Sequence, residues 1–189
     1  MIRIGMLGDI GSGKSYIANK FGYPVFNADY EVSKLYKKSK KTFSKLNKEL
    51  PKYIKSFPVN KDHVTKAIFS NKTNFKKITN IVHKEINKKM KSFLRTNKNK
   101  EIVILDIPLL LENKINKKKD ILVFVDAKKK DIEKRLIKRR NFDRKLFNKF
   151  KKLQFSSLYK KKKSHFIIKN DFKKQSVKNE IKNILKKIL

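Results

Sequence analysis

The stretch GDIGSGKSYIANKF, residues 8–21, contains three of the five glycines in this chain of 189 residues. The apolar residues 2–7 precede it and predict a strand that is buried on both faces. Residues 14–21 predict a helix. Glycines at such a junction let the backbone wrap around an anion, because no side chain separates its N–H groups from the anion. The stretch therefore predicts an α/β fold with a phosphate-binding turn.

Four residues of this turn match the pattern G-x-x-x-x-G-K-[ST], namely Gly8, Gly13, Lys14 and Ser15. We expect Lys14 to reach the terminal phosphates of a nucleoside triphosphate and the Ser15 hydroxyl to ligate Mg²⁺. A glycine-rich turn without a ligand is less favoured, because the pattern lies between a strand and a helix. The predicted nucleotide-binding residues are Gly8, Asp9, Ile10, Gly11, Ser12, Gly13, Lys14, Ser15 and Tyr16.

Strand and helix patterns alternate along the rest of the chain. Further strands are expected at residues 23–26, 101–112, 120–127 and 164–168, and further helices at residues 29–37, 130–139 and 176–189. Residues 42–93 have a helical pattern that Pro51 and Pro58 interrupt. Such alternation favours a parallel sheet covered by helices, in one domain that spans residues 1–189.

Composition excludes several classes of site. The chain has no cysteine, which excludes disulfides, thiolate metal sites and a cysteine nucleophile. Residues 1–7 are too short for a signal peptide, and no apolar run approaches the roughly 20 residues that span a bilayer. We therefore expect a cytoplasmic protein with no membrane partner.

The formal net charge of +36 has two interpretations. A basic surface can indicate a nucleic-acid partner, which it attracts without sequence specificity. The charge can also reflect compositional drift toward lysine. Drift is favoured because only six of the 52 basic residues are arginine, the residue preferred for specific base contacts. The lysine run at residues 160–163 is accordingly expected to be exposed to solvent.

An acidic residue, Asp29, follows the second predicted strand. Ligands collect at the carboxyl ends of parallel strands, so a carboxylate at this point is expected near the phosphate-binding turn. It can accept a proton from an attacking hydroxyl group. It can equally cap the helix that begins there. Position alone leaves both interpretations open.

The chain resembles the dephospho-CoA kinase family over nearly its whole length. The matching segments, in family order, are IGSGKS (residues 10–15), NAD (27–29), AIFSN (67–71), ITNIVHKEI (78–86), LDIPLLLE (105–112) and RLIKR (135–139). The chain departs from the family pattern at Asp9, where glycine is usual, at Asn27, where aspartate is usual, at Lys84, where proline is usual, and at Leu111, where phenylalanine is usual.

The resemblance implies a P-loop kinase-like three-layer α/β sandwich with a mainly parallel sheet of five strands. It also implies a helical subdomain at about residues 40–95, which binds the CoA end of the acceptor, and a helical lid at about residues 140–162. The implied reaction uses ATP and Mg²⁺ and transfers the γ-phosphoryl group to the ribose 3′-hydroxyl of dephospho-CoA, giving CoA and ADP. A monomer or weak oligomer with small-molecule partners is expected.

The resemblance further implies roles for individual residues. The predicted catalytic residues are Lys14, Asp29 as the base that activates the acceptor hydroxyl, and Arg139 of the lid, which also binds ATP. His83 and Asp106 are candidate acceptor-binding residues together with Asp29. Asp106, at the end of a buried strand, is also a candidate magnesium ligand with Ser15. A purely structural role remains an alternative for His83 and for Asp106. Arg140 and Arg144 remain alternatives to Arg139 as the lid arginine.

Two other functions remain open at the level of sequence. Another P-loop kinase, with a nucleoside or nucleotide as acceptor, would share the phosphate-binding turn. A nucleic-acid-binding protein that retains a nucleotide fold would explain the net charge, but the chain has no recognisable reader motif and no separate basic arm.

Overall fold

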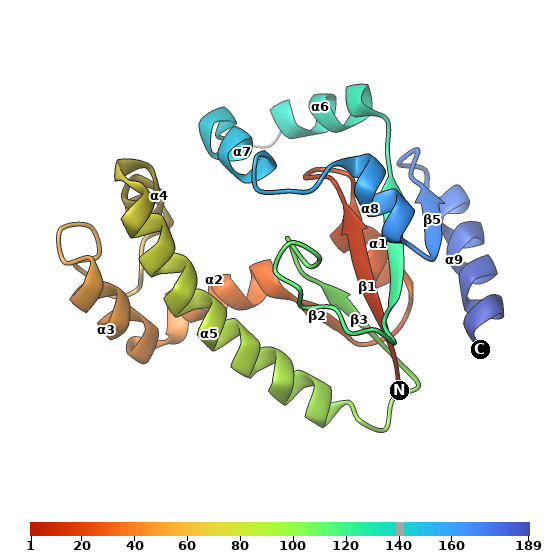
Figure 1. Cartoon of the computed structure of the whole chain (residues 1–189), viewed down its shortest axis with the longest axis horizontal. Helices are drawn as coiled ribbons and strands as arrows, with labels where there is room; N and C mark the ends of the chain where they lie inside the picture. Colours follow the sequence, from red (N-terminus) through yellow and green to blue (C-terminus); the bar gives the residue numbers. More distant parts are fainter. Residues whose placement is uncertain (139–141) are drawn as a thin grey trace. The chain divides into compact units, whose positions relative to one another are not determined.

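The computed structural model describes residues 1–138 and 142–189 of the chain. Their strands are β1 (Ile2–Gly8), β2 (Val25–Asn27), β3 (Ile102–Asp106), β4 (Ile121–Asp126) and β5 (Phe166–Lys169). They form a single sheet in the order β2-β3-β1-β4-β5 (Figure 1). Neighbouring strands pair in parallel throughout this sheet. The predicted five-stranded parallel sheet is therefore confirmed, and the carboxyl ends of all its strands lie at one edge.

The strand expected at residues 101–112 is shorter than predicted. β3 ends at Asp106, and residues 108–114 form turns. Pro108 has no N–H group with which to continue a ladder, and Leu109 adopts a left-handed backbone with a φ of 58°. The chain therefore leaves the sheet directly after Asp106, which stands at the carboxyl edge as expected. The ends of the other strands differ from the prediction by one or two residues.

The chain divides into two compact units. Met1–Asn27 and Asn97–Leu189 form an α/β unit, and Ala28–Thr96 form a helical unit. The helices of the α/β unit are α1 (Lys14–Lys20), α6 (Lys129–Ile137), α7 (Arg144–Lys151), α8 (Ser157–Lys163) and α9 (Lys174–Ile188). Those of the helical unit are α2 (Ala28–Lys38), α3 (Lys40–Glu49), α4 (Lys61–Ser70) and α5 (Lys72–Thr96).

Both faces of the sheet are covered, because alternate residues of a strand point to opposite faces. Val123 and Val125 of β4 belong to a buried apolar cluster with α1 and α9, whose members include Ile17 and Ile181. Phe124 points to the other face, where Lys161 of α8 lies 5.7 Å from the centre of its ring. The α/β unit therefore has the three-layer arrangement that the sequence predicted.

The helical unit is built around its longest helix, α5. α2, α3 and α4 all pack against α5, which buries Ile78, Val82 and Ile86 at helical spacing. Pro51 and Pro58 lie in the connection between α3 and α4, as predicted, and Asn71 separates α4 from α5. Ion pairs from Lys45 to Glu85 (2.7 Å) and from Lys77 to Glu49 (3.0 Å) join α3 to α5.

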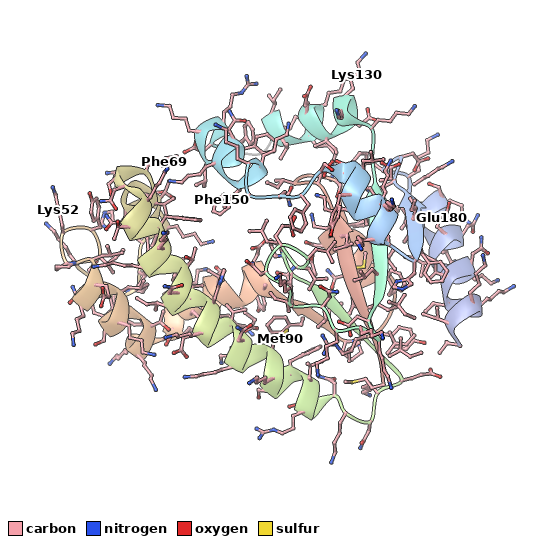
Figure 2. The ribbon with its side chains drawn as sticks, in the orientation of Figure 1. Lys52, Phe69, Met90, Lys130, Phe150 and Glu180 are labelled. Atoms are coloured by element: carbon pink, nitrogen blue, oxygen red, sulfur yellow. The ribbon has the colours of Figure 1, made fainter. Side chains whose placement is uncertain are left out.

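Lysine side chains extend from the surfaces of both units, as Lys52 and Lys130 illustrate (Figure 2). Among the described residues, no helix is both long and apolar enough to cross a bilayer.

Candidate active site

The phosphate loop, residues 8–15, connects the end of β1 to the start of α1. Gly8 has a φ of 145° and Gly13 a φ of 95°, which side-chain-bearing residues rarely adopt. A Cβ atom on Gly8 would lie 2.7 Å from Ser12 Oγ, and one on Gly13 would lie 2.5 Å from Asn170 Nδ2. Glycine is therefore required at both positions by backbone conformation and by space, as the motif predicted.

The Lys14 ammonium group lies against this loop. Its Nζ donates to the carbonyl oxygens of Gly8 and Asp9, each at 3.1 Å. The Asp9 carbonyl oxygen also accepts from Ser12 N at 3.1 Å, which closes a turn within the loop. The loop thus combines glycine backbone with a lysine cation, the arrangement that cradles a polyphosphate in proteins with this motif.

Asn170, which follows the edge strand β5, makes a hydrogen bond to the phosphate loop. It directly follows β5 and is 4% exposed. Its Nδ2 donates to the carbonyl oxygen of Ser12 at 2.7 Å, and its Oδ1 accepts from Phe172 N at 3.0 Å. Asn170 is not among the residues predicted for the site. Its position just after the last predicted strand, at the carboxyl edge of a parallel sheet, was the signal that could have found it.

Asp106 and Asn27 meet at the same edge, since they are paired residues at the ends of β3 and β2. Asn27 Nδ2 donates to Asp106 Oδ2 at 2.6 Å, and Asp106 is 3% exposed. No cluster of three or more His, Cys, Asp or Glu side chains suited to a metal occurs in residues 1–138 and 142–189. Mg²⁺ is usually held by one or two carboxylates together with substrate phosphates, so a donor set of Asp106 and the Ser15 hydroxyl fits this ion.

Lys160 corrects one expectation. The run at residues 160–163 was predicted to be solvent-exposed, but Lys160 is only 2% exposed, whereas Lys162 and Lys163 are exposed. Its Nζ lies 2.8 Å from Asp9 Oδ1. Burial of this lysine is possible because a carboxylate of the phosphate loop pairs with it.

Comparison with known proteins identifies the family. A family model described as dephospho-CoA kinase matches residues 2–176. The dephospho-CoA kinase of Wolbachia pipientis wMel is 32% identical over 187 residues, covering 96% of this chain and 95% of that protein. The chain belongs to the dephospho-CoA kinase family. This confirms the predicted family and, with it, the prediction of an ATP-dependent phosphotransferase.

Solved structures agree on the fold of this dephospho-CoA kinase family member. TT1252 from Thermus thermophilus superposes with a TM-score of 0.80 at 22% identity, covering 100% of this chain and 98% of that one. The dephospho-CoA kinase from Campylobacter jejuni gives a TM-score of 0.65 at 21% identity, covering 98% and 96%. The predicted P-loop kinase-like architecture is therefore confirmed.

Several residues predicted for a dephospho-CoA kinase lie in the helical unit. Asp29 is the second residue of α2 and is exposed, in the first helical turn where a carboxylate is stabilised by the helix dipole. His83 lies on α5 with its surface exposed, although desolvation by the surrounding protein lowers the pKa of its imidazole. Their roles toward the kinase acceptor stay predictions.

The remaining predicted residues belong to the α/β unit. Tyr16, on α1, is 41% exposed, and Lys20 Nζ lies 5.5 Å from the centre of its ring. Arg144 is the exposed first residue of α7, which Asp143 caps by accepting from Leu146 N at 3.0 Å. Arg139, the predicted lid arginine of the kinase, and its alternative Arg140 lie outside the described residues.

Proposed function

We propose that this chain transfers the γ-phosphoryl group of ATP to the ribose 3′-hydroxyl of dephospho-CoA, giving CoA and ADP. The observation that carries the proposal is the phosphate loop, in which Lys14 Nζ is held by the carbonyl oxygens of Gly8 and Asp9. Family membership over residues 2–176 supports dephospho-CoA as the acceptor.

The phosphate loop and Lys14 hold the triphosphate. In our proposal, the Lys14 ammonium exchanges its contacts with the loop carbonyl oxygens for contacts with phosphate oxygens. The charge-assisted hydrogen bonds so formed are stronger than those to neutral carbonyl groups. The backbone conformation at Gly8 and Gly13 gives the loop one shape, which holds the bound triphosphate in one position on the loop. Residues 8–16 are the proposed nucleotide-binding segment.

Ser15 and Asp106 are the residues proposed to hold Mg²⁺. A Mg²⁺ ion held there would supply positive charge that offsets the negative charge of the triphosphate. Asn27 donates to Asp106 Oδ2, which fixes the orientation of this carboxylate at the carboxyl edge of the sheet.

Asp29 is the proposed general base. The 3′-hydroxyl proton passes to its carboxylate while the 3′-oxygen forms a bond to the γ-phosphorus. The bond from the γ-phosphorus to the bridging oxygen breaks, and ADP leaves with that oxygen. Arg139 is proposed to neutralise the charge that develops on the transferring group. No covalent enzyme intermediate is required.

His83 is proposed to contact the acceptor. Desolvation lowers the pKa of its imidazole, which favours the neutral ring near neutral pH. A neutral imidazole both donates and accepts a hydrogen bond, so it suits recognition of a polar group on the acceptor.

The absence of cysteine is consistent with the reducing cytoplasm, where we place the protein as a monomer or weak oligomer.

A coupled ADP-release assay tests the proposal. Purified protein with ATP and Mg²⁺ should release ADP when dephospho-CoA is added, and mass spectrometry should detect CoA. Adenosine and nucleoside monophosphates should release ADP at the background rate. If a nucleoside is turned over as fast as dephospho-CoA or faster, the nucleoside and not dephospho-CoA is the acceptor. Salt-sensitive binding of RNA or DNA without acceptor-dependent ADP release would contradict an enzymatic role.

A further inference from the structure

An ion pair joins the phosphate loop to α8. Lys160 Nζ lies 2.8 Å from Asp9 Oδ1 and 3.4 Å from the carbonyl oxygen of Gly8. Ser157, three residues earlier on α8, donates from its Oγ to Asp9 Oδ2 at 2.6 Å. Both carboxylate oxygens of Asp9 therefore accept from a single helix. We call Asp9, Ser157 and Lys160 the Asp9 cluster.

Lys160 is enclosed to a degree that distinguishes it from its neighbours. Its side chain is 3% exposed, and that of its partner Asp9 is 34% exposed. On the same helix, the side chain of Lys161 is 35% exposed and pairs with Asp126 at 2.7 Å. An ammonium group loses its hydration when it is buried, so a specific partner is needed to hold it there. Asp9 is that partner.

Asp9 keeps its negative charge in this position. Burial opposes its ionisation, but hydrogen bonds from Lys160 and Ser157 and the charges of Lys160 and Lys14 together lower the pKa of its carboxyl group. The phosphate loop therefore contains a carboxylate. Such a group would repel a polyphosphate bound at the loop unless a cation neutralised it, because two negative charges close together in a partly buried site repel each other.

The geometry places two ammonium groups on this one loop. Lys14 Nζ lies 3.1 Å and Lys160 Nζ 3.4 Å from the same carbonyl oxygen, that of Gly8. Lys160 also contacts the Asp9 carboxylate, whereas Lys14 contacts the Asp9 carbonyl oxygen. Lys160 is thus the lysine that hydrogen-bonds to the Asp9 carboxylate, whereas the contacts of Lys14 with the loop are to carbonyl oxygens.

We infer that Lys160 is a positioning residue for nucleotide binding: it neutralises Asp9, and so lowers the repulsion between this carboxylate and the phosphates of ATP. Lys160 acts through Asp9 and does not itself contact the nucleotide. The inference rests on the proposed function, because it takes ATP as the ligand of the phosphate loop. Composition alone does not distinguish Lys160 from the exposed lysines of the same run.

A double-mutant cycle on the full chain tests this inference. Lys160→Met removes the cation and keeps most of the side-chain volume, so the Kd for Mg²⁺–ATP should rise by about tenfold or more because Asp9 loses its counter-charge. Asp9→Asn removes the side-chain charge and keeps the backbone of the loop, so this variant should bind Mg²⁺–ATP more tightly than Lys160→Met does. The double variant should recover most of the affinity lost in Lys160→Met, because no carboxylate remains to be neutralised.

Kinetics separate this role from a merely structural one. Lys160→Met should raise the KM for ATP while kcat at saturating ATP and the KM for dephospho-CoA stay within about twofold, since a loss of folded protein would lower the apparent kcat instead. Lys161→Met is the matched control: it removes a cation from the next position of α8, where the partner is Asp126, and should leave the Kd unchanged.

Two results would overturn the inference: wild-type affinity in Lys160→Met, or a double variant that binds ATP as weakly as Lys160→Met alone. If Lys160→Met does not fold, the comparison of Asp9→Asn with the double variant decides: once Asp9 carries no charge, removal of Lys160 should change the Kd by less than about threefold, and a larger loss contradicts neutralisation as the role of Lys160. Turnover of dephospho-CoA by the wild-type chain tests the proposed function separately, so failure of the cycle leaves that function standing.

Discussion

The side-chain amide of Asn27 donates a 2.6 Å hydrogen bond to Oδ2 of Asp106. The two residues end neighbouring parallel strands in register, so their side chains meet at the carboxyl edge of the sheet. An amide supplies a donor without a charge. The pair therefore carries the single negative charge of Asp106, held in one orientation, at the position where we propose that Mg²⁺ binds.

Replacing Asn27 with aspartate should destabilise the fold in a pH-dependent way. The variant has two carboxylates in contact, which raises the pKa of the pair in the folded state because like charges repel. In buffer with a chelator, Asn27→Asp should lower the Tm most at about pH 8, and the loss should shrink toward about pH 5 as the pair takes up a proton. Circular dichroism during heating measures the Tm.

Asn80→Asp is the control for this change of charge, because Asn80 lies on the exposed surface of α5. A pH profile for Asn27→Asp that matches the profile for Asn80→Asp would show that contact with Asp106 does not matter.

Replacing Asp29 with alanine should abolish turnover while ATP binding remains measurable. Loss of a general base typically lowers the rate by about 10²-fold to 10⁴-fold. Glu31→Ala is the matched control, since Glu31 lies in the same first turn of α2 and pairs with Lys34 at 3.1 Å. The coupled ADP assay measures the rate, and isothermal titration calorimetry measures ATP binding. Near-normal turnover of Asp29→Ala would remove Asp29 from the role of base.

Gly13→Ala should lower the unfolding free energy by more than the strain of its positive φ alone would. The new methyl group meets Asn170 Nδ2 at 2.5 Å, in addition to the strain of a φ of 95°. Gly22→Ala is the control, because Gly22 has a φ of 79° and nothing within 4 Å of a Cβ atom. We expect Gly22→Ala to cost about 1 to 2 kcal/mol of unfolding free energy and Gly13→Ala to cost more.

Urea unfolding measures both glycine variants, and calorimetry measures their affinity for ATP. Gly13→Ala should bind ATP weakly, whereas Gly22→Ala should bind it normally. Equal unfolding free energies for the two variants would show that the contact with Asn170 is easily relieved.

The Asp9 cluster predicts a contribution to stability that is lost in acid. The pKa of Asp9 is lowered in the folded state, so ionised Asp9 stabilises the fold above its unfolded pKa, and this contribution disappears as the pH falls through its folded pKa. The difference in unfolding free energy between the wild type and Asp9→Asn should therefore shrink from about pH 5 to about pH 2. A difference that stays constant over this range would contradict the lowered pKa.

The features that could be predicted from the sequence are those that neighbouring residues specify. Buried strands appear as apolar runs, and the amphipathic helix α5 appears as apolar residues at spacings of three and four. The phosphate loop could be predicted because backbone conformation at Gly8 and Gly13 is a local property, and Lys14 follows directly in the chain. Pairing of the strands into a parallel sheet followed from their alternation with helices.

Contacts between distant residues required the tertiary structure. Asn170 is 158 positions from Ser12, and Lys160 is 151 positions from Asp9. The place of Asn170 after the last predicted strand indicates the carboxyl edge of the sheet, but the sequence specifies neither Ser12 nor Asp9 as a partner. Lys160 in particular belongs to a run of lysines that reads as exposed surface. It is buried because α8 packs against β1 and β4. Local preference fixes the elements of this protein, whereas burial and charge pairing arise only when those elements pack together.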